Sequence, residues 1–323
     1  MNAMLGKAAL AAATLACGAA AAQERDLLIG STSASSSHYG YFVAVGQLIN
    51  ENADGVSASV VETGATMDNL RRMQRGQVDL GLVTTNTALH ALEGRNAFEG
   101  DPQDLSLMWV YTISPQNVIV RSDAGVDSLD GLTSEIALNP GIKGSSTEAT
   151  SEQVFATLGI DADLVRGSTT DIVDAIKDNR VAGYVKSGAG EKLDSSTMDI
   201  ATATDIKVLG LSDAQVETIR AEMPDISVVE IPEGAGAGIP AYRTWAFGAG
   251  VAATSALDEE TAYQIVAAVM ADDSVQPNAM AGTDGASLAE MTLEHGTIPL
   301  HPGAARWFRE QGMEIPDRLQ PAD

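Results

Sequence analysis

The chain has 323 residues, 45% of them hydrophobic and 20% charged, which is the composition of a globular protein and enough length for two domains of ordinary size. Acidic residues outnumber basic residues by 44 to 19, and the resulting net charge of −25 repels phosphate backbones, so no nucleic-acid partner is expected. Cys17 is the single cysteine, which excludes an intramolecular disulfide and a cysteine metal cluster.

The first 22 residues have the pattern of a cleaved secretory signal peptide. Lys7 supplies a positive charge, small apolar residues follow from Ala8 to Gly18, and Ala20-Ala21-Ala22 offers a small-x-small cleavage site. Cleavage there places the mature protein in the periplasm and also removes Cys17. A lipoprotein signal with Cys17 as the lipidated residue is the alternative, but Leu15 lies one place away from its usual position.

Apolar runs of strand character alternate with helical patterns at the start of the mature chain. The sequence predicts strands over residues 26–29, 56–61 and 78–83. Apolar residues at helical spacing predict helices from Phe42 to Ile49, from Met67 to Met73 before Gly76, and from about Thr87 to Gly94. This alternation is typical of a parallel, doubly wound sheet.

The middle of the chain repeats the alternation. Strands are predicted over residues 117–121, 135–138 and 181–186, and a capping box at Ser145-x-x-Glu148 opens a helix that stops at Gly159. A Gly/Pro-rich loop over residues 231–240 precedes a strand-like run over 244–253, and helices with Met291 and Trp307 end the chain. We expect an α/β fold of two doubly wound lobes, with residues 23–117 and 253–323 in lobe 1 and residues 118–252 in lobe 2.

Signatures of catalysis are sparse. The sequence has no G-x-S-x-G elbow, no phosphate-binding P-loop and no H-E-x-x-H helix, and its four histidines lack metal-ligand spacing. We therefore expect no catalytic residues, no metal and no cofactor.

Hydroxyl and amide side chains instead gather after predicted strands and before predicted helices. These clusters are Ser31–Ser37, Thr63–Thr66, Thr84–Asn86 and Asn139–Thr147, the last with Lys143 inside it. Such loops lie at the carboxyl ends of parallel strands, where helix N-termini offer free N–H groups to an anion. Ordinary helix capping by Ser and Thr is the other interpretation of each single cluster.

The loops also resemble those of a known family, the solute-binding subunits of TRAP transporters of the TAXI type. Residues 31–40, STSASSSHYG, keep the register of that family's first loop, although Ser and Thr replace its glycines. Further matches are Thr63-Gly64-Ala65-Thr66-Met67-Asp68-Asn69-Leu70, Gly76 to Val83, Gly144-Ser145-Ser146-Thr147 and His301-Pro302-Gly303-Ala304-Ala305-Arg306-Trp307. The matches span most of the mature chain.

The resemblance implies a two-lobed periplasmic binding protein of type II that captures a small anionic solute and delivers it to a TRAP permease in the membrane. It implies a carboxylate such as glutamate or 2-oxoglutarate, and we expect a monomer. Two alternatives are a ligand sensor that signals to a membrane kinase and an enzyme on the same bilobal fold. The best-known enzyme of that fold needs a cysteine, which the mature chain lacks.

The candidate binding residues come from the loops and from the resemblance. The first loop of the family places ligand contacts at Ser37, His38 and Tyr39, and its third loop at Asn86. A cationic anchor is expected from Lys143, Lys186 or Arg243, because a carboxylate needs a positive partner. The remaining candidates are Ser33, Ser36, Thr63, Thr66, Thr85, Ser145 and Thr147. Closure on binding would use crossovers near Gln116–Val120 and Phe247–Ala252 as the hinge.

Overall fold

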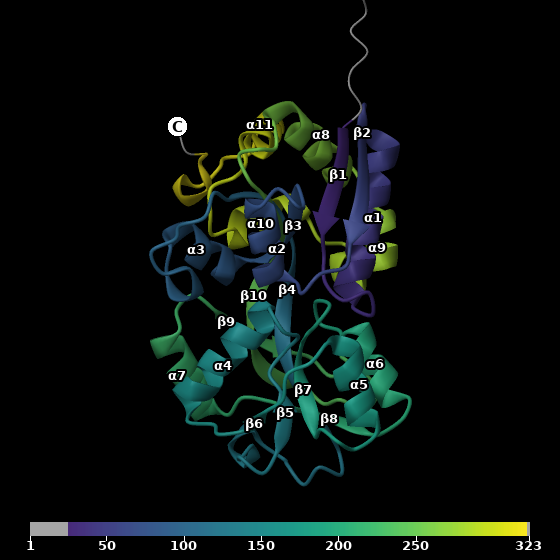
Figure 1. Cartoon of the computed structure of the whole chain (residues 1–323), viewed down its shortest axis with the longest axis vertical. Coiled ribbons are helices and arrows are strands. Elements are labelled where there is room, and N and C mark those ends of the chain that lie inside the picture. The colour runs from purple at the N-terminus through teal and green to yellow at the C-terminus, as the bar shows by residue number, and fades with distance from the viewer. Residues whose placement is uncertain (1–24, 322–323) are drawn as a thin grey trace, which may run out of the picture.

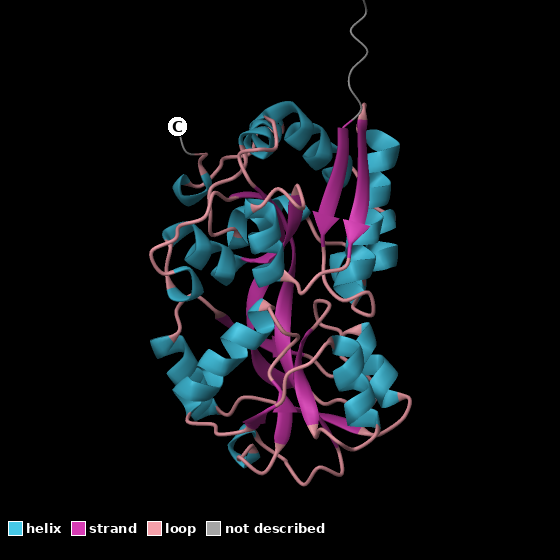
Figure 2. Cartoon of the chain, in the orientation of Figure 1, coloured by secondary structure: helices cyan, strands magenta, loops and turns pink. Residues whose placement is uncertain are grey.

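Two long antiparallel strands, β4 (Ser106–Arg121) and β10 (Tyr242–Ala253), run along the molecule and connect its two lobes (Figure 1). The computed structural model describes residues 25–321, so the signal peptide predicted over residues 1–22 lies outside the described residues. Both strands belong to one ten-stranded sheet in the order β2-β1-β3-β10-β4-β7-β5-β6, with β8 paired to β4 and β9 paired to β10. Helices cover this sheet on both sides in each lobe (Figure 2).

The first lobe, at the top of Figure 1, contains the alternation predicted for the start of the chain. Its parallel strands are β1 (Arg25–Gly30), β2 (Val56–Val61) and β3 (Leu80–Thr84). The helices that follow them are α1 (Ser37–Asn52), α2 (Thr66–Gln74) and α3 (Thr85–Glu93). After β10 the chain returns to this lobe as α8 (Glu259–Met270), α9 (Val275–Ala279), α10 (Leu288–His295) and α11 (Pro302–Glu310).

The second lobe has its own parallel set of strands. β5 (Ala137–Asn139) lies between β6 (Asp163–Leu164) and β7 (Gly183–Ser187), while β8 (Ile206–Leu209) and β9 (Ser227–Ile231) pair antiparallel to the long strands. Its helices are α4 (Ser146–Leu158), α5 (Thr169–Lys177), α6 (Ser195–Ala201) and α7 (Asp213–Glu222). The predicted fold class, α/β with two doubly wound lobes, is confirmed.

Helix α4 begins and ends where the sequence predicts, but one predicted contact at its start differs. Gly159 ends the helix in the left-handed conformation, at φ 70°, as a glycine allows. At the start, the Ser145 side chain accepts a hydrogen bond of 3.1 Å from the Glu148 N–H, as predicted. The reciprocal half of the capping box is wrong, because the Glu148 carboxylate accepts from the N–H of Gly144 at 2.8 Å.

A stack of aromatic side chains joins α1 to the first lobe's core. The rings of Tyr41 and Tyr111 are stacked with centroids 4.0 Å apart, and both side chains are fully buried. The Trp109 Nε1–H donates to the Tyr41 hydroxyl at 2.8 Å, and that hydroxyl donates to Gln276 at 2.8 Å. These bonds satisfy the polar ends of buried aromatics and fix α1, and with it the loop before α1, against β4 and α9.

Asn69 of α2 holds the carboxyl ends of neighbouring strands together. Its buried amide donates to the carbonyl of Ser31 at 2.9 Å and to the carbonyl of Leu82 at 3.0 Å, and its Oδ1 accepts from the Thr63 hydroxyl at 2.7 Å. Gly30 leaves the space for this side chain, since a Cβ there would lie 2.5 Å from Oδ1. One amide therefore sets the spacing of the loops after β1, β2 and β3.

Replacing Asn69 by Ala should destabilise the protein by at least about 2 kcal/mol, because each buried polar group left without a partner costs about 1–3 kcal/mol. Urea unfolding measures this loss. The variant Asn278→Ala, at an exposed asparagine, is the control and should stay within about 0.5 kcal/mol of the unmodified chain. An equally small change for Asn69→Ala would contradict the role of Asn69 in holding the strand ends together.

Candidate functional site

A small buried cavity lies between the lobes, where the loops after the parallel strands of both lobes meet. Its volume is about 40 Å³. The first lobe contributes loops after β1, β2 and β3, and the second lobe contributes the start of α4 and the end of β7. Most of its lining side chains are hydroxyls or small apolar groups. The lining residues are Thr32, Ser36, His38, Ala65, Thr66, Leu82, Thr84, Ser114, Ile142, Ser145, Ser146, Thr147, Val185, Lys186, Ser187 and Ala249.

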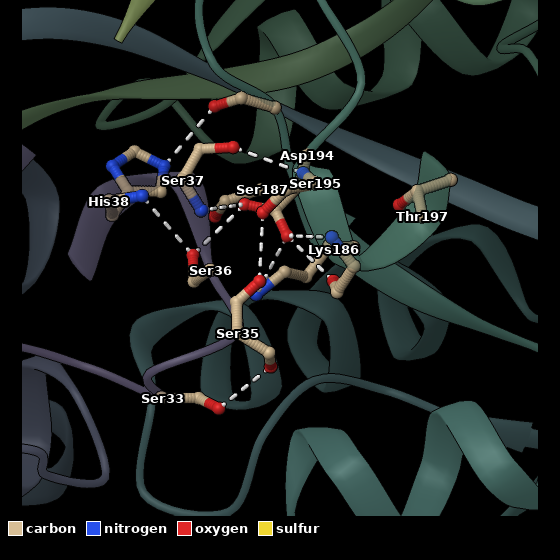
Figure 3. A network of polar contacts seen from close by, with 12 residues as sticks. Ser33, Ser35, Ser36, Ser37, His38, Lys186, Ser187, Asp194, Ser195 and Thr197 are labelled. Atoms are coloured by element: carbon tan, nitrogen blue, oxygen red, sulfur yellow. Dashed lines mark hydrogen bonds and ion pairs between the residues drawn. The ribbon is translucent and has the colours of Figure 1, made fainter. Parts of the chain in front are cut away.

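On one side of the cavity, a carboxylate of the second lobe binds the N-terminus of α1 in the first lobe (Figure 3). Asp194 Oδ2 accepts a hydrogen bond of 2.9 Å from the Ser36 hydroxyl and another of 2.9 Å from the Ser37 N–H. The first N–H groups of a helix lack partners within the helix and carry partial positive charge, so they favour a carboxylate. Ser195 extends this contact, because its N–H donates to the Ser37 hydroxyl at 3.0 Å.

The other oxygen of Asp194 is used within the second lobe. Oδ1 accepts from the Ser196 N–H at 3.0 Å and from the Ser196 hydroxyl at 2.6 Å, and the ammonium of Lys186 lies 3.6 Å away. Burial alone would raise the pKa of Asp194, but the positive charge of Lys186 and the hydrogen bonds from Ser196 outweigh burial and hold that pKa below its ordinary value. Asp194 is therefore a buried, ionised carboxylate with both oxygens occupied.

His38 lies beside this pair as a neutral side chain. Burial lowers the pKa of His38 to about 4, against a smaller opposing effect of the Asp194 charge. Nε2 is 3.2 Å from the carbonyl oxygen of Gly188, which can only accept, so Nε2 carries the proton. Nδ1 is 2.8 Å from the hydroxyl of Tyr111 and accepts from it. Both ring nitrogens are thus engaged by the protein itself.

On the other side of the cavity, the N-termini of α2 and α4 approach each other from opposite lobes. The N–H of Met67 donates to the carbonyl of Gly144 at 3.0 Å. Thr66, Ser146 and Thr147 stand in the first turns of these helices and line the cavity. Since the first turn of a helix has no internal acceptor for its N–H groups, both helix ends present donors and partial positive charge to this space.

Further hydrogen bonds close the lobes upon each other. The Thr84 hydroxyl donates to Ser146 Oγ at 2.6 Å, and the Asn86 amide donates to the Thr150 hydroxyl at 3.1 Å. At the edge near α3, His90 Nε2 and Asp225 Oδ2 are 2.5 Å apart, and this contact lowers the pKa of Asp225. The described arrangement is therefore the closed one, with polar contacts from one lobe to the other around the cavity.

The structure brings some of the residues predicted for the site to the cavity and leaves others outside its lining. Those that line it are Ser36, His38, Thr66, Ser145, Thr147 and Lys186. Those that do not are Ser33, Ser37, Tyr39, Thr63, Thr85, Asn86, Lys143 and Arg243.

The residues outside the lining have other partners. Thr63 donates to Ser31 O and Asn69, and Thr85 accepts from the Gly248 N–H at 3.0 Å. Lys143 is exposed. Arg243, one of the three basic residues expected as the anchor, pairs instead with Asp213 and donates to the carbonyl of Leu211, and it does not line the cavity.

Sequence reasoning missed Asp194, whose Oδ2 accepts two hydrogen bonds from the first lobe. The pattern Asp194-Ser195-Ser196 signals an N-cap, and Asp194 does cap α6 by accepting from the Ser196 N–H. Its second role joins residues 158 positions apart in the sequence, at Ser36, which local pattern cannot reveal. Ser114 and Ser187 also line the cavity and were missed, because single serines within strands carry no distinctive signal, whereas Ser146 lines it from within the predicted cluster Asn139–Thr147.

Two further properties concern the described residues as a whole. Within residues 25–321, no helix combines the length and apolar character that a membrane span requires. Over the same range, no three His, Cys, Asp or Glu side chains are grouped so that they could hold one metal ion.

The neutral state of His38 predicts a pH dependence of stability. Its pKa in the folded protein, about 4, is below the ordinary 6.5, so the unfolded chain binds the extra proton between these values and stability falls as the pH falls from about 6.5 to about 4. His38→Gln removes this titration and keeps a donor for Gly188. Urea unfolding at several pH values should show the stability of the unmodified chain declining more steeply than that of the variant, by about 1–3 kcal/mol across the window.

The control for the loss of a histidine is His295→Gln, at a half-buried position outside the cavity lining. Parallel stability curves for the unmodified chain and His38→Gln would contradict the assignment of a buried, neutral His38.

Comparisons with known proteins agree with this architecture. Three solved structures share the fold over nearly their whole length. The first is the zinc-bound ligand-binding component of an ABC-type import system from Staphylococcus aureus, with 10% sequence identity, coverage of 92% of this chain and 96% of that one, and a TM-score of 0.51. The second is a periplasmic transporter, with 14% identity, coverage of 90% of this chain and 98% of that one, and a TM-score of 0.54. The third is Rpa4515 of R. palustris with adipate, with 17% identity, coverage of 88% of this chain and 95% of that one, and a TM-score of 0.54. They show a type II periplasmic-binding-protein fold. The model of the NMT1-like family matches residues 29–312, and the chain therefore belongs to the NMT1-like family.

Proposed function

We propose that this protein is an extracytoplasmic receptor that captures a small anionic solute between its lobes and delivers it to a membrane permease. The observation that carries the proposal is the state of Lys186. Its side chain is 8% exposed and lines the cavity, and its ammonium has Asp194 at 3.6 Å but no hydrogen-bond acceptor among the described residues. An ammonium group has three donors, which an anion in the cavity would satisfy.

The helix ends at the cavity support the same proposal. The starts of α2 and α4 face the space from opposite lobes, and N–H groups of this kind bind carboxylates and other oxyanions. The hydroxyls of Thr66, Ser145 and Thr147 add donors that can rotate toward the solute. His38, the one histidine in the lining, has both nitrogens engaged by Tyr111 and Gly188 and is not free to transfer protons. The site is built to bind without chemical change.

The finer assignments rest on the sequence. The signal-peptide pattern of residues 1–22 favours the periplasm, and the resemblance of the loops to TAXI-type subunits favours a TRAP permease as the partner. Delivery to a permease requires the solute to enter and leave, and hydrogen bonds hold the lobes together around the cavity. The lobes must therefore open.

We place the hinge in the two long strands. Residues Gln116–Val120 of β4 pair with β7 of the second lobe, and Ala249–Ala253 of β10 pair with β3 of the first lobe. Rotation would fall between these paired segments, at residues 113–116 and 244–248. The hinge expected from the sequence, Gln116–Val120 and Phe247–Ala252, and the lobe boundaries expected at 117/118 and 252/253 lie a few residues further along both strands than this division.

A thermal-shift screen of the chain without its signal peptide, residues 23–323, against small carboxylates tests the receptor role. A carboxylate at 100 times its Kd should stabilise the fold by about 2.7 kcal/mol and raise the Tm. Lys186→Gln should weaken binding by about 30-fold or more, because losing one partner of a desolvated charge pair costs about 2–5 kcal/mol. Mass spectrometry should recover the carboxylate unchanged.

The matched control is Lys192→Gln, which changes an exposed lysine that donates to the Gly234 carbonyl and should keep the shift. Chemical conversion of the carboxylate, or the absence of a shift with every one tested, would overturn the receptor role.

A reversible crosslink tests the opening of the lobes. Residues 23–323 contain no cysteine, so a pair introduced as Ser37→Cys and Ser195→Cys is the only disulfide that can form. The two serines touch across the lobes in the closed arrangement. The oxidised double variant should neither take up nor release a carboxylate that binds the parent chain, and reduction should restore both. Each single variant is a control, and exchange at the same rate in the oxidised form would contradict opening at the hinge.

A further inference from the structure

We propose that the cavity selects short monocarboxylates and rejects amino acids and dicarboxylates, with Asp194 as the residue that determines this specificity. The inference rests on the proposed function, narrows its solute, and departs from glutamate and 2-oxoglutarate, the solutes that the resemblance implies. Three observations carry it: the saturation of the Asp194 carboxylate by groups of the protein, the balance of charge around the cavity, and the size of the enclosed space.

The first observation concerns an ammonium group on the solute. An amino acid buried with its charged ammonium needs a carboxylate or several free acceptors to replace water. Asp194 already accepts from the Ser36 hydroxyl, the Ser37 N–H, the Ser196 N–H and the Ser196 hydroxyl. Among the described residues that line the cavity, none is Asp or Glu. A solute ammonium would therefore find Lys186 and helix N-termini, which repel it.

The second observation concerns the number of negative charges that the site can hold. Lys186 and Asp194 form a pair whose charges cancel, and His38 is neutral above a pH of about 4. The starts of α2 and α4 each contribute about half a positive charge, which together balance about one negative charge. The acids in these first turns, Asp68 and Glu148, are each paired with an arginine and do not line the cavity. A second carboxylate on the solute would be buried without compensation.

The third observation is the space available when the lobes are closed. The cavity measures about 40 Å³, so it offers room for a small solute only. That space fits a carboxylate with a short substituent. The apolar part of the lining suits a short carbon chain beside the carboxylate and consists of Ala65, Leu82, Ile142, Val185 and Ala249.

Asp194 also explains why a second anionic group is refused at the nearest alternative place. The N-terminus of α1 would itself bind an anion, but the protein's own carboxylate occupies it. Neutralising Asp194 would therefore release the Lys186 charge and weaken the hold on α1, so that one more negative charge could be accommodated.

Isothermal titration calorimetry of residues 23–323 tests the selectivity with matched pairs of probes. Pyruvate and L-alanine have equal numbers of non-hydrogen atoms and differ in the ammonium, while propionate and succinate differ in the second carboxylate. We expect pyruvate to bind about tenfold or more tightly than alanine, and propionate to exceed succinate by the same margin. Inorganic phosphate and sulfate serve as probes for tetrahedral anions, and both should bind more weakly than propionate.

The variant Asp194→Asn should reduce the preference for propionate over succinate by about tenfold. Asp199→Asn is its control, since it changes an exposed carboxylate of the same helix that pairs with Lys177 and should leave the preference unaltered. If Asp194→Asn does not fold, the two probe pairs measured on the unmodified chain still test the selectivity for monocarboxylates.

Alanine, succinate, phosphate or sulfate binding as tightly as the monocarboxylates would overturn the inference and leave the receptor role intact. If neither the probes nor any larger carboxylate binds, both the inference and the receptor role are overturned.

Discussion

The buried carboxylate of Asp194 is the interaction on which the closed arrangement depends. It lies at the start of α6 in one lobe, and it binds the start of α1 in the other lobe through Ser36 and Ser37. A charge buried to this degree is stable only when hydrogen bonds and an opposite charge replace its water, and Ser196 and Lys186 supply them. The same contacts determine which groups can bind a solute. The ammonium of Lys186 still has N–H groups that can donate to it, whereas both oxygens of the Asp194 carboxylate already accept hydrogen bonds from the protein.

The fold makes that contact possible by aligning two sets of loops. The aromatic stack of Tyr41 and Tyr111 fixes α1 on β4, and the Asn69 amide fixes the loops after β1, β2 and β3 relative to one another. β4 and β10 then carry the second lobe's loops to the opposite side of the same space. The closed cavity is thus the meeting place of strand ends from both lobes, which explains why a lining rich in hydroxyls comes from so many separate segments.

Local pattern was sufficient for much of the fold. Apolar periodicity and glycine stops located β1 to α3, the helix α4 and its end at Gly159, because these elements bury one face and end at a residue with special backbone freedom. The pattern found only residues 117–121 of β4, whose other residues are almost all buried and therefore lack alternation, and it missed β8 and β9 at the sheet's periphery. The loops of the candidate site were located for the same reason as the elements, since they follow strands and precede helices.

The partners within those loops were beyond local pattern. Arg243 and Lys186 both lie in strands, and nothing in the sequence around them tells that one pairs with exposed Asp213 and the other with buried Asp194. Thr63 and Thr85 are hydroxyls of the expected kind, but the fold uses them to hold Asn69 and Gly248. Sequence therefore located the region of the site, and the pairing of charges across the lobes decided its chemistry.

A crystal structure of residues 23–323 grown with pyruvate tests the central claim most directly, namely that the space between the lobes holds an anion bound to Lys186. We expect carboxylate density in the interlobe cavity, with an oxygen within hydrogen-bond distance of Lys186 Nζ and another near the first turn of α2 or α4, while Asp194 keeps its bonds to Ser36 and Ser37. Pyruvate bound elsewhere on the molecule, or a cavity that holds water alone at saturating pyruvate, would contradict it.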